Sequence, residues 1–133
     1  MKNYEEKALA TELLDFIDAS PSSFHAVHTI ASLLEKEGYT ELKESEKWNP
    51  EEGKGYFVCR NGSSVIAFRY QKDYTGFSIS AAHSDYPCFK IKDKGELTGE
   101  FVRLNTERYG GMICSTWLDR PLSVAGRVLV ETD

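Results

Sequence analysis

The chain has 133 residues and a formal net charge of −5, and 41% of its residues are hydrophobic. This is enough apolar material for a folded core, so the sequence is that of a globular domain and not of a disordered segment. Acidic and basic residues are mixed along the whole length, which argues against a nucleic-acid or anionic-membrane surface. The apolar stretches are short, whereas a membrane span needs roughly 20 apolar residues, so we expect no membrane-spanning segment.

The cysteines and the amino terminus bear on the cellular compartment. Cys59, Cys88 and Cys114 are an odd number at wide spacings, which fits neither a disulfide framework nor a Cys-x-x-Cys metal site. Free cysteines tend to be buried, so we expect reduced, mostly buried thiols. Residues 1–7 lead into an amphipathic pattern and not into the continuous apolar core of a secretory signal. We therefore expect a cytoplasmic protein.

Two helices are predicted near the amino terminus. Apolar residues recur at helical spacing over residues 9–17, with acidic residues on the other face. Ser20 and Pro21 then supply a cap and a proline at the first helical position. A second apolar stripe covers residues 24–34, and Gly38 is the residue type that commonly ends a helix. Together these patterns predict a helical hairpin.

Strands are predicted after a charged, exposed connection that ends near Lys54. Residues 56–58 and 65–70 flank Asn61-Gly62, a dipeptide that favours a hairpin turn. Residues 77–82 then form an apolar run of the kind found in largely buried strands. This third strand is expected to run directly into His83.

The second half of the chain has a different pattern. Short strands are expected at residues 89–91, 101–104 and 124–130, separated by glycine and charged turns. The change from mixed helix and strand to strand alone near Lys92 indicates a domain boundary. We expect an α/β fold class, α+β within these residues, with one domain over 1–92 and the start of a β-rich unit over 93–133.

His83 follows the third predicted strand, and Asp85 lies two residues further on. An imidazole in this position can ligate a metal while the carboxylate accepts the imidazole's second N–H, which fixes the tautomer and the ring direction. Positions i and i+2 of an extended backbone lie on the same side, so both groups can face one cavity. By itself the pattern is a weak signal, since a surface histidine near an aspartate cap gives the same spacing.

Four motifs in a fixed order add context. They are Ser20-Pro21-Ser22-Ser23-Phe24-His25; His83-Ser84-Asp85-Tyr86-Pro87; Tyr109-Gly110-Gly111; and Trp117-Leu118-Asp119-Arg120 with Val124-Ala125-Gly126-Arg127-Val128. In this order they resemble the motifs of the aspartyl aminopeptidase family. The resemblance spans essentially the whole chain, and the family's proteins continue far past Asp133. Departures at Ser84 and Tyr86 bear on the shape of the pocket more than on metal ligation.

The resemblance implies a zinc-dependent aminopeptidase that removes acidic amino-terminal residues from peptides. It implies two zinc ions held by two histidines, a bridging aspartate, a further aspartate and a glutamate, with another glutamate as general base. Of the metal ligands, only His83 lies in this chain, and Asp85 takes the orienting role in the catalytic site. The chain alone is therefore expected to be inactive.

The resemblance also bears on domains and partners. It implies that residues 1–92 belong to the catalytic domain and that residues 93–133 begin an inserted β-rich oligomerisation domain. The complete protein is then expected to be a homo-oligomer acting on peptides, without nucleic-acid or membrane partners. The alternative is a non-catalytic truncated domain that keeps only the fold and an interaction surface.

Other polar residues have simpler interpretations. Asp119 and Arg120 are expected to form an ion pair or a turn cap, and Asp119 is not taken as the bridging metal ligand. His25 is expected to pack or to cap its helix, although it falls within a family motif, and His28 is expected at the surface. Tyr109-Gly110-Gly111 lacks the lysine and helix of a phosphate loop and is expected to form a turn.

Overall fold

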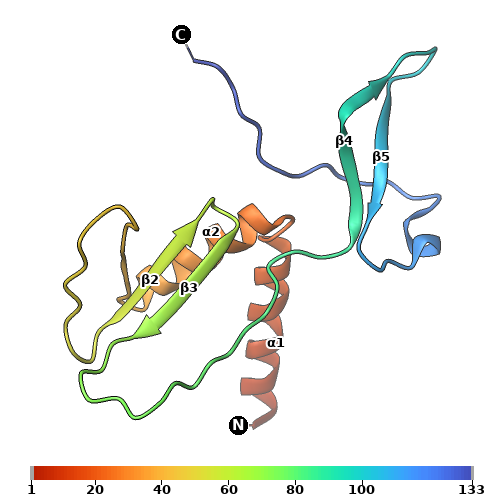
Figure 1. Ribbon diagram of the computed structural model, residues 1–133. Coiled ribbons are helices and arrows are strands. Elements are labelled where there is room, and N and C mark those ends of the chain that lie inside the picture. Colours follow the sequence, from red (N-terminus) through yellow and green to blue (C-terminus); the bar gives the residue numbers. More distant parts are fainter. Residues whose placement is uncertain (1, 133) are drawn as a thin grey trace. The chain divides into compact units, whose positions relative to one another are not determined.

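The computed structural model describes residues 2–132. Its elements are α1 (Lys2–Asp18), α2 (Ser23–Lys36), β1 (Thr40–Glu41), β2 (Gly55–Arg60), β3 (Ser64–Arg69), β4 (Cys88–Leu97), β5 (Arg103–Tyr109) and a 3₁₀ turn, η1 (Cys114–Trp117) (Figure 1). This is the α+β composition expected from the sequence. Over residues 2–132 no helix combines the length and the hydropathy that a membrane crossing requires.

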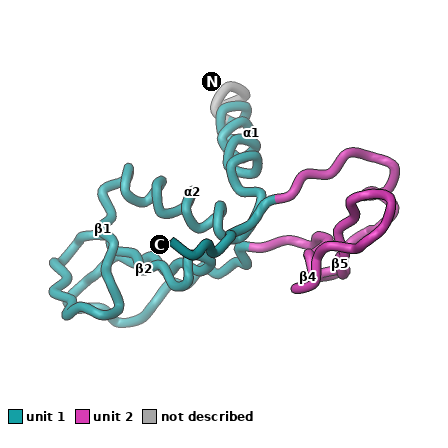
Figure 2. The backbone as a smooth tube through the Cα atoms, turned by 90° about the horizontal axis from the view of Figure 1, so that it is seen from above, with its two compact units in different colours: residues 1–84, 125–133 teal, residues 85–124 magenta. Residues whose placement is uncertain are grey.

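The chain forms two compact units (Figure 2). The first contains residues 1–84 and 125–133, and the second contains residues 85–124. These limits place β4 wholly in the second unit. The domains expected from the sequence were a catalytic domain over 1–92 and an inserted domain over 93–133. These are domains of the complete family proteins, so this division stays a prediction.

The first unit is a helix packed on a small sheet. The strand order is β1-β2-β3, with β1 parallel and β3 antiparallel to β2, and α2 contacts all three strands. The core consists of Ala26 and Val27 from α2 and of Tyr56 and Phe57 from β2, all of which are buried. The apolar stripe predicted on the second helix is therefore the one that the sheet covers.

Helix α2 begins later than its sequence signals suggest. The carbonyl of Ser22 accepts the first helical hydrogen bond, from the N–H of Ala26 at 2.9 Å, so Ser22 and not Ser20 is the N-cap residue. Pro21 therefore precedes the cap instead of occupying the first helical position, which corrects the prediction. The end is as expected, because Gly38 adopts φ +80°, a conformation that glycine reaches without steric cost.

The hairpin predicted at Asn61-Gly62 is confirmed. Asn61 and Gly62 have φ values of 54° and 66°, and the N–H of Ser63 donates to the carbonyl of Arg60 at 3.2 Å. Two left-handed central residues closed by this bond make a type I′ turn, whose twist matches that of antiparallel strands. Strand pairing resumes with Arg60 opposite Ser64, so the connection between β2 and β3 comprises residues 61–63.

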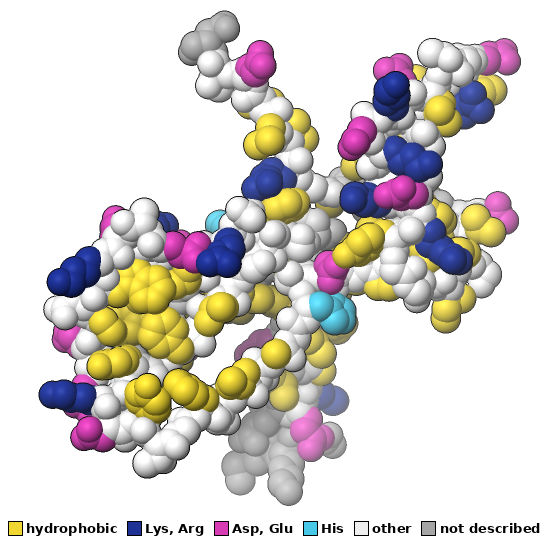
Figure 3. Space-filling view, viewed as in Figure 1, with side chains coloured by type: hydrophobic (Ala, Val, Ile, Leu, Met, Phe, Trp, Pro, Cys, Tyr) yellow, Lys and Arg dark blue, Asp and Glu magenta, His cyan; other side chains and the backbone are white. Residues whose placement is uncertain are grey.

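Residues 77–82 do not form the buried strand that was expected. The segment after β3 is irregular, and Phe77 and Ile79 are 79% and 83% exposed. Figure 3 shows hydrophobic side chains lying at the surface along this segment. A buried strand needs neighbouring strands and cover on both faces, and the sheet that residues 2–132 build here ends at β3. Residues 124–130, where another strand was expected, are also irregular, and they are exposed.

Helix α1 forms where predicted, but its apolar side chains are largely exposed. These are Leu9, Leu13, Leu14 and Ile17. The hydroxyl of Thr29 in α2 donates to the carbonyl of Ala19 at 3.4 Å, just after α1 ends. Among the described residues α1 makes no extensive contact with α2, so the packed helical hairpin that was expected does not form, and burial of an apolar stripe is confined to α2.

The second unit is built on an antiparallel pair of strands. β4 pairs with β5, with a register shift between Ile91 and Glu96. The ring of Phe89 meets that of Trp117 edge to face, with centroids 5.6 Å apart. Trp117 belongs to η1, which the expectation of strands alone beyond Lys92 had overlooked. A single 3₁₀ turn has too few residues to show a helical period, which is why the pattern missed it.

Candidate functional site

His83 is an exposed residue of the first unit and lies at the end of the irregular segment that follows β3. The next residue, Ser84, is half-buried, and its hydroxyl donates to the carbonyl of Ser63 at 2.9 Å. Ser63 belongs to the turn between β2 and β3. The backbone next to His83, the candidate metal ligand, is therefore hydrogen-bonded to the turn between β2 and β3 through Ser84.

Asp85 is the first residue of the second unit and is half-buried. The hydroxyl of Tyr109 donates to its Oδ2. This hydrogen bond, together with the charge of the carboxylate, raises the pKa of the Tyr109 phenol, because phenolate would lose the bond and be repelled. His83 and Asp85 belong to different units, so the orienting bond expected between them stays a prediction.

Tyr109 is a contact that the sequence reasoning missed. Its motif was interpreted as a turn, which Gly110 does form with φ +75°. The contact could have been found from the pairing of the two strands, since Tyr109 lies opposite Cys88 in the register of β4 and β5. That pairing brings Tyr109 near the residues that precede Cys88, among them Asp85.

The described residues do not complete a metal site. Over residues 2–132 no group of three or more His, Cys, Asp or Glu side chains lies close enough to hold a metal ion. An imidazole such as that of His83 is a donor that zinc prefers, whereas a closed zinc site uses about four ligands. The imidazole of His83 thus suits zinc as a single donor, and the remaining ligands are not gathered around it among residues 2–132.

Two other histidines have local roles that agree with expectation. His25 Nδ1 lies 2.8 Å from the Oγ of Ser22, the N-cap residue of α2. This contact is consistent with the packing or capping role foreseen for His25. His28 is exposed, as expected.

Asp119 lies in a turn. Its φ of 54° is left-handed, a conformation that Asp tolerates better than most residues. Arg120 Nη1 donates to the carbonyl of Thr116 at 3.2 Å and closes the segment locally. The turn at Asp119 agrees with part of the structural expectation for this pair, and the expectation that Asp119 is not the bridging metal ligand stays a prediction.

A cavity of about 430 Å³ opens between α2 and the sheet of the first unit. Its lining includes Phe24 and Val27 of α2, Phe57 of β2 and the side chain of Arg127. The guanidinium of Arg127 lies over the ring of Phe24, 4.4 Å from its centroid. Arg127 was expected within a strand, so this stacking is a second contact that sequence reasoning missed.

The cysteines are free thiols, as predicted, although all three are half-buried and not fully buried. Burial is the main factor that raises the pKa of Cys59. A raised pKa disfavours the thiolate, which is the form that attacks substrates and binds metals. Cys59 therefore lines the cavity of the first unit as a neutral side chain.

Comparison with known proteins defines the class. Residues 16–133 match the family described as Aminopeptidase I zinc metalloprotease (M18). This match covers most of the sequence, and the chain belongs to the M18 family of metallo-aminopeptidases. The resemblance seen in the four motifs is thereby confirmed.

Individual relatives agree with this assignment. The chain is 53% identical over 127 residues to "Probable M18 family aminopeptidase 2" of Clostridium novyi (strain NT), which is 92% of this chain and 29% of the relative. It is 42% identical to "Aspartyl aminopeptidase 1" of Schizosaccharomyces pombe, covering 96% of this chain and 28% of that protein. The chain thus spans less than a third of the length of the curated relatives it matches.

Solved structures share the fold. A complex of Ape4 and Nbr1 matches with a TM-score of 0.80 and 40% identity, over 86% of this chain and 23% of the other. The S. cerevisiae mApe1 dodecamer matches with a TM-score of 0.78 and 31% identity, over 89% of this chain and 28% of the other.

Proposed function

We propose that these residues form the amino-terminal part of a cytoplasmic, zinc-dependent aminopeptidase that removes acidic amino-terminal residues from peptides. The observation that carries the proposal is the family match over residues 16–133. It is supported by a relative named as an aspartyl aminopeptidase. A homo-oligomer with two zinc ions per active site is part of the proposal, and the dodecamer of the similar mApe1 supports the assembly.

Within this function we assign His83 as a zinc ligand and Asp85 as the carboxylate that orients it. Exposure of His83 supports the first role, because a ligand must be reachable by the ion and by donors from elsewhere. The hydrogen bond from Tyr109 supports the second, because it restrains the carboxylate of Asp85, as is usual for a carboxylate that orients a metal ligand. Among residues 2–132, we assign roles in the reaction to these two residues alone.

The proposal predicts weak zinc binding and no peptidase activity for the chain by itself. Zinc should be titrated into the wild type, His83→Ala and the matched control His28→Ala, with binding followed at the histidine resonances. Weak binding that is lost in His83→Ala and kept in His28→Ala is the expected result. Equal binding by all three proteins would exclude His83 as a ligand.

The alternative function is a non-catalytic domain that keeps only the fold and an interaction surface. The reading frame downstream of residue 133 separates the two possibilities. A continuation that contains an adjacent Glu-Glu pair and a late histidine supports the enzyme, and a stop codon supports the alternative. Hydrolysis of an aspartyl-anilide by the 133-residue chain, abolished by a chelator, would contradict the expected inactivity.

A further inference from the structure

The turn between β2 and β3, residues 61–63, is joined to two segments that are distant along the chain. The hydroxyl of Ser84 donates to the carbonyl of Ser63 at 2.9 Å. Arg127 Nη1 donates to the carbonyl of Asn61, also at 2.9 Å. All of these residues lie in the first unit, so the turn is a common anchor for the two segments.

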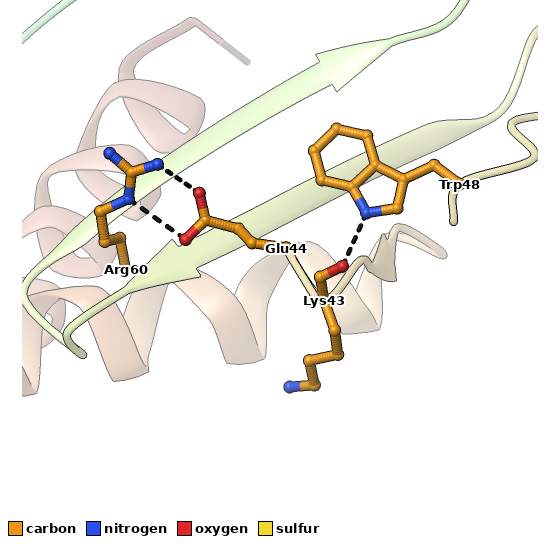
Figure 4. A network of polar contacts seen from close by, with 4 residues as sticks. All are labelled: Lys43, Glu44, Trp48 and Arg60. Carbon is orange, nitrogen blue, oxygen red and sulfur yellow. Dashed lines mark hydrogen bonds and ion pairs between the residues drawn. The ribbon is translucent and has the colours of Figure 1, made fainter. Parts of the chain in front are cut away.

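Local interactions hold the start of this turn. Its type I′ geometry is closed by the bond from Ser63 to Arg60. Arg60 also forms a two-point ion pair with Glu44, in which Nε lies 3.1 Å from Oε2 (Figure 4). The end of β2 is therefore tied to the connection that precedes it, while the carbonyls of Asn61 and Ser63 receive the hydrogen bonds from Arg127 and Ser84.

Arg127 binds the turn and α2 at the same time. Its guanidinium stacks on Phe24 of α2 at 4.4 Å from the ring centroid while one edge donates to Asn61. A planar guanidinium can combine a stacking face with N–H donors along its edge, which a lysine ammonium cannot do. Arg127 thereby holds the turn against the helix whose buried face forms the core of the unit.

Ser84 connects the exposed segment that follows β3 to the turn at residues 61–63. Every residue from 71 to 83 is exposed, whereas Ser84 is half-buried. The hydrogen bond from Ser84 therefore ties the backbone next to His83 to the turn between β2 and β3. Fixing the backbone on one side of His83 restricts where its imidazole can point.

We infer that Ser84 and Arg127 are positioning residues for His83, acting through the turn at residues 61–63. Ser84 acts directly on the backbone next to the imidazole, and Arg127 acts by holding the turn. The inference rests on the proposed function only in taking His83 as a metal ligand. The hydrogen-bonded anchor itself is a property of the chain without metal.

The first experiment measures backbone order without metal in the 133-residue chain. Order parameters from ¹⁵N relaxation should be compared at residues 82–84 for the wild type, Ser84→Ala and Ser84→Thr. We expect a value near about 0.85 in the wild type and below about 0.6 in Ser84→Ala, the ranges of rigid and flexible backbone. Threonine keeps the hydroxyl, so Ser84→Thr should restore the wild-type value.

The same measurement tests Arg127. Arg127→Ala and Arg127→Lys should both lower the order at residues 61–63 and at His83, because lysine keeps the charge but loses the stacked fork. Unchanged amide resonances for β2 would show that each variant is folded. Unchanged order at His83 in Ser84→Ala, or in both Arg127 variants, would overturn the inference for the residue concerned.

The second experiment asks whether this order matters for zinc. Removing a group that orients a metal ligand typically lowers affinity 10- to 100-fold, so we expect zinc to bind Ser84→Ala about tenfold more weakly and Ser84→Thr as it binds the wild type. Loss of order with unchanged zinc affinity would overturn the positioning role. Zinc binding that is unaffected by His83→Ala would instead refute the assignment of His83 as a zinc ligand in the proposed function and leave the metal-free result for the anchor standing.

Discussion

The hydroxyl of Tyr109 donates a hydrogen bond to the Oδ2 of Asp85, 24 residues earlier in the chain. Tyr109 is the last residue of β5, and its partner in the register is Cys88 at the start of β4. The strand pairing therefore brings two separate sequence motifs together within the second unit. This contact restrains the carboxylate to which we assign the orientation of a metal ligand.

Asp85→Asn is expected to lower the pKa of Tyr109 towards its ordinary value of about 10. The carboxylate raises this pKa first by accepting the phenol's hydrogen bond and then by its charge, and a neutral amide lacks that charge. The pKa can be followed at ¹³C-labelled tyrosines, with Tyr109→Phe to assign the signal. Asp119→Asn, an exposed aspartate in the same unit, is the control and should leave the pKa unchanged.

The raised pKa of Tyr109 also predicts the pH dependence of stability. The folded-state pKa lies above the unfolded-state value, so the stabilisation is fully present below about pH 10 and is lost as the pH rises through the folded pKa. Wild type and Tyr109→Phe should thus converge in stability at strongly alkaline pH. A constant difference across that range would contradict the assigned hydrogen bond.

Phe57 and Phe77 offer the same substitution at opposite extremes of burial. Phe57 is 1% exposed and Phe77 is 79% exposed. Phe57→Ala should lower the free energy of unfolding by roughly 3–5 kcal/mol because it removes core contacts and leaves a cavity. Phe77→Ala should change it by less than about 0.5 kcal/mol, as is usual for surface positions. Urea denaturation measures both, and a comparable loss for Phe77→Ala would show that its segment is packed.

Gly55→Ala tests the contact between β2 and Tyr39. A Cβ at Gly55 would lie 2.6 Å from Cδ1 of the Tyr39 ring, and the ring is held by Arg69, whose Nε donates to the Tyr39 hydroxyl at 3.2 Å. Overpacking of this kind typically costs about 1–3 kcal/mol. Gly76→Ala, where the Cβ meets nothing within 4 Å, is the control. Equal thermal stability of the two variants would show that the ring moves away freely.

The ion pair between Glu44 and Arg60 should make a small, salt-sensitive contribution to stability. The hydrogen bond from Arg60 lowers the pKa of Glu44, so the stabilisation is present above the unfolded value of about 4.3 and is lost as the pH falls through the folded pKa. Arg60→Gln should lower the melting temperature at neutral pH and low salt. The difference should disappear near 1 M salt, where the Debye length is about 3 Å. Lys72→Gln is the control for loss of an exposed charge.

Features set by neighbouring residues could be predicted without the structure. The turn at Asn61-Gly62 was foreseen because both residues tolerate the left-handed backbone that a type I′ turn requires. The end of α2 at Gly38 was foreseen for the same reason. The start of α2 was misplaced by two residues, since Ser20 and Ser22 are the same residue type and only the hydrogen bond from the N–H of Ala26 to the carbonyl of Ser22 distinguishes them.

Features set by distant residues were predicted less well. The run at residues 77–82 has the composition of a buried strand, but composition does not supply the neighbouring strands that such a strand needs. The contacts of Tyr109 with Asp85 and of Arg127 with Phe24 join residues far apart in sequence. No local pattern encodes such pairs.

The amino-acid sequence by itself determined the family and the turn that follows β2, because these depend on residue identity and on interactions over a few positions. Tertiary structure decided which apolar stripe is buried, which carbonyl receives Ser84 and which ring Arg127 covers. Those outcomes depend on which surfaces the folded backbone brings into contact, and burial and hydrogen bonding over long separations have no local signature.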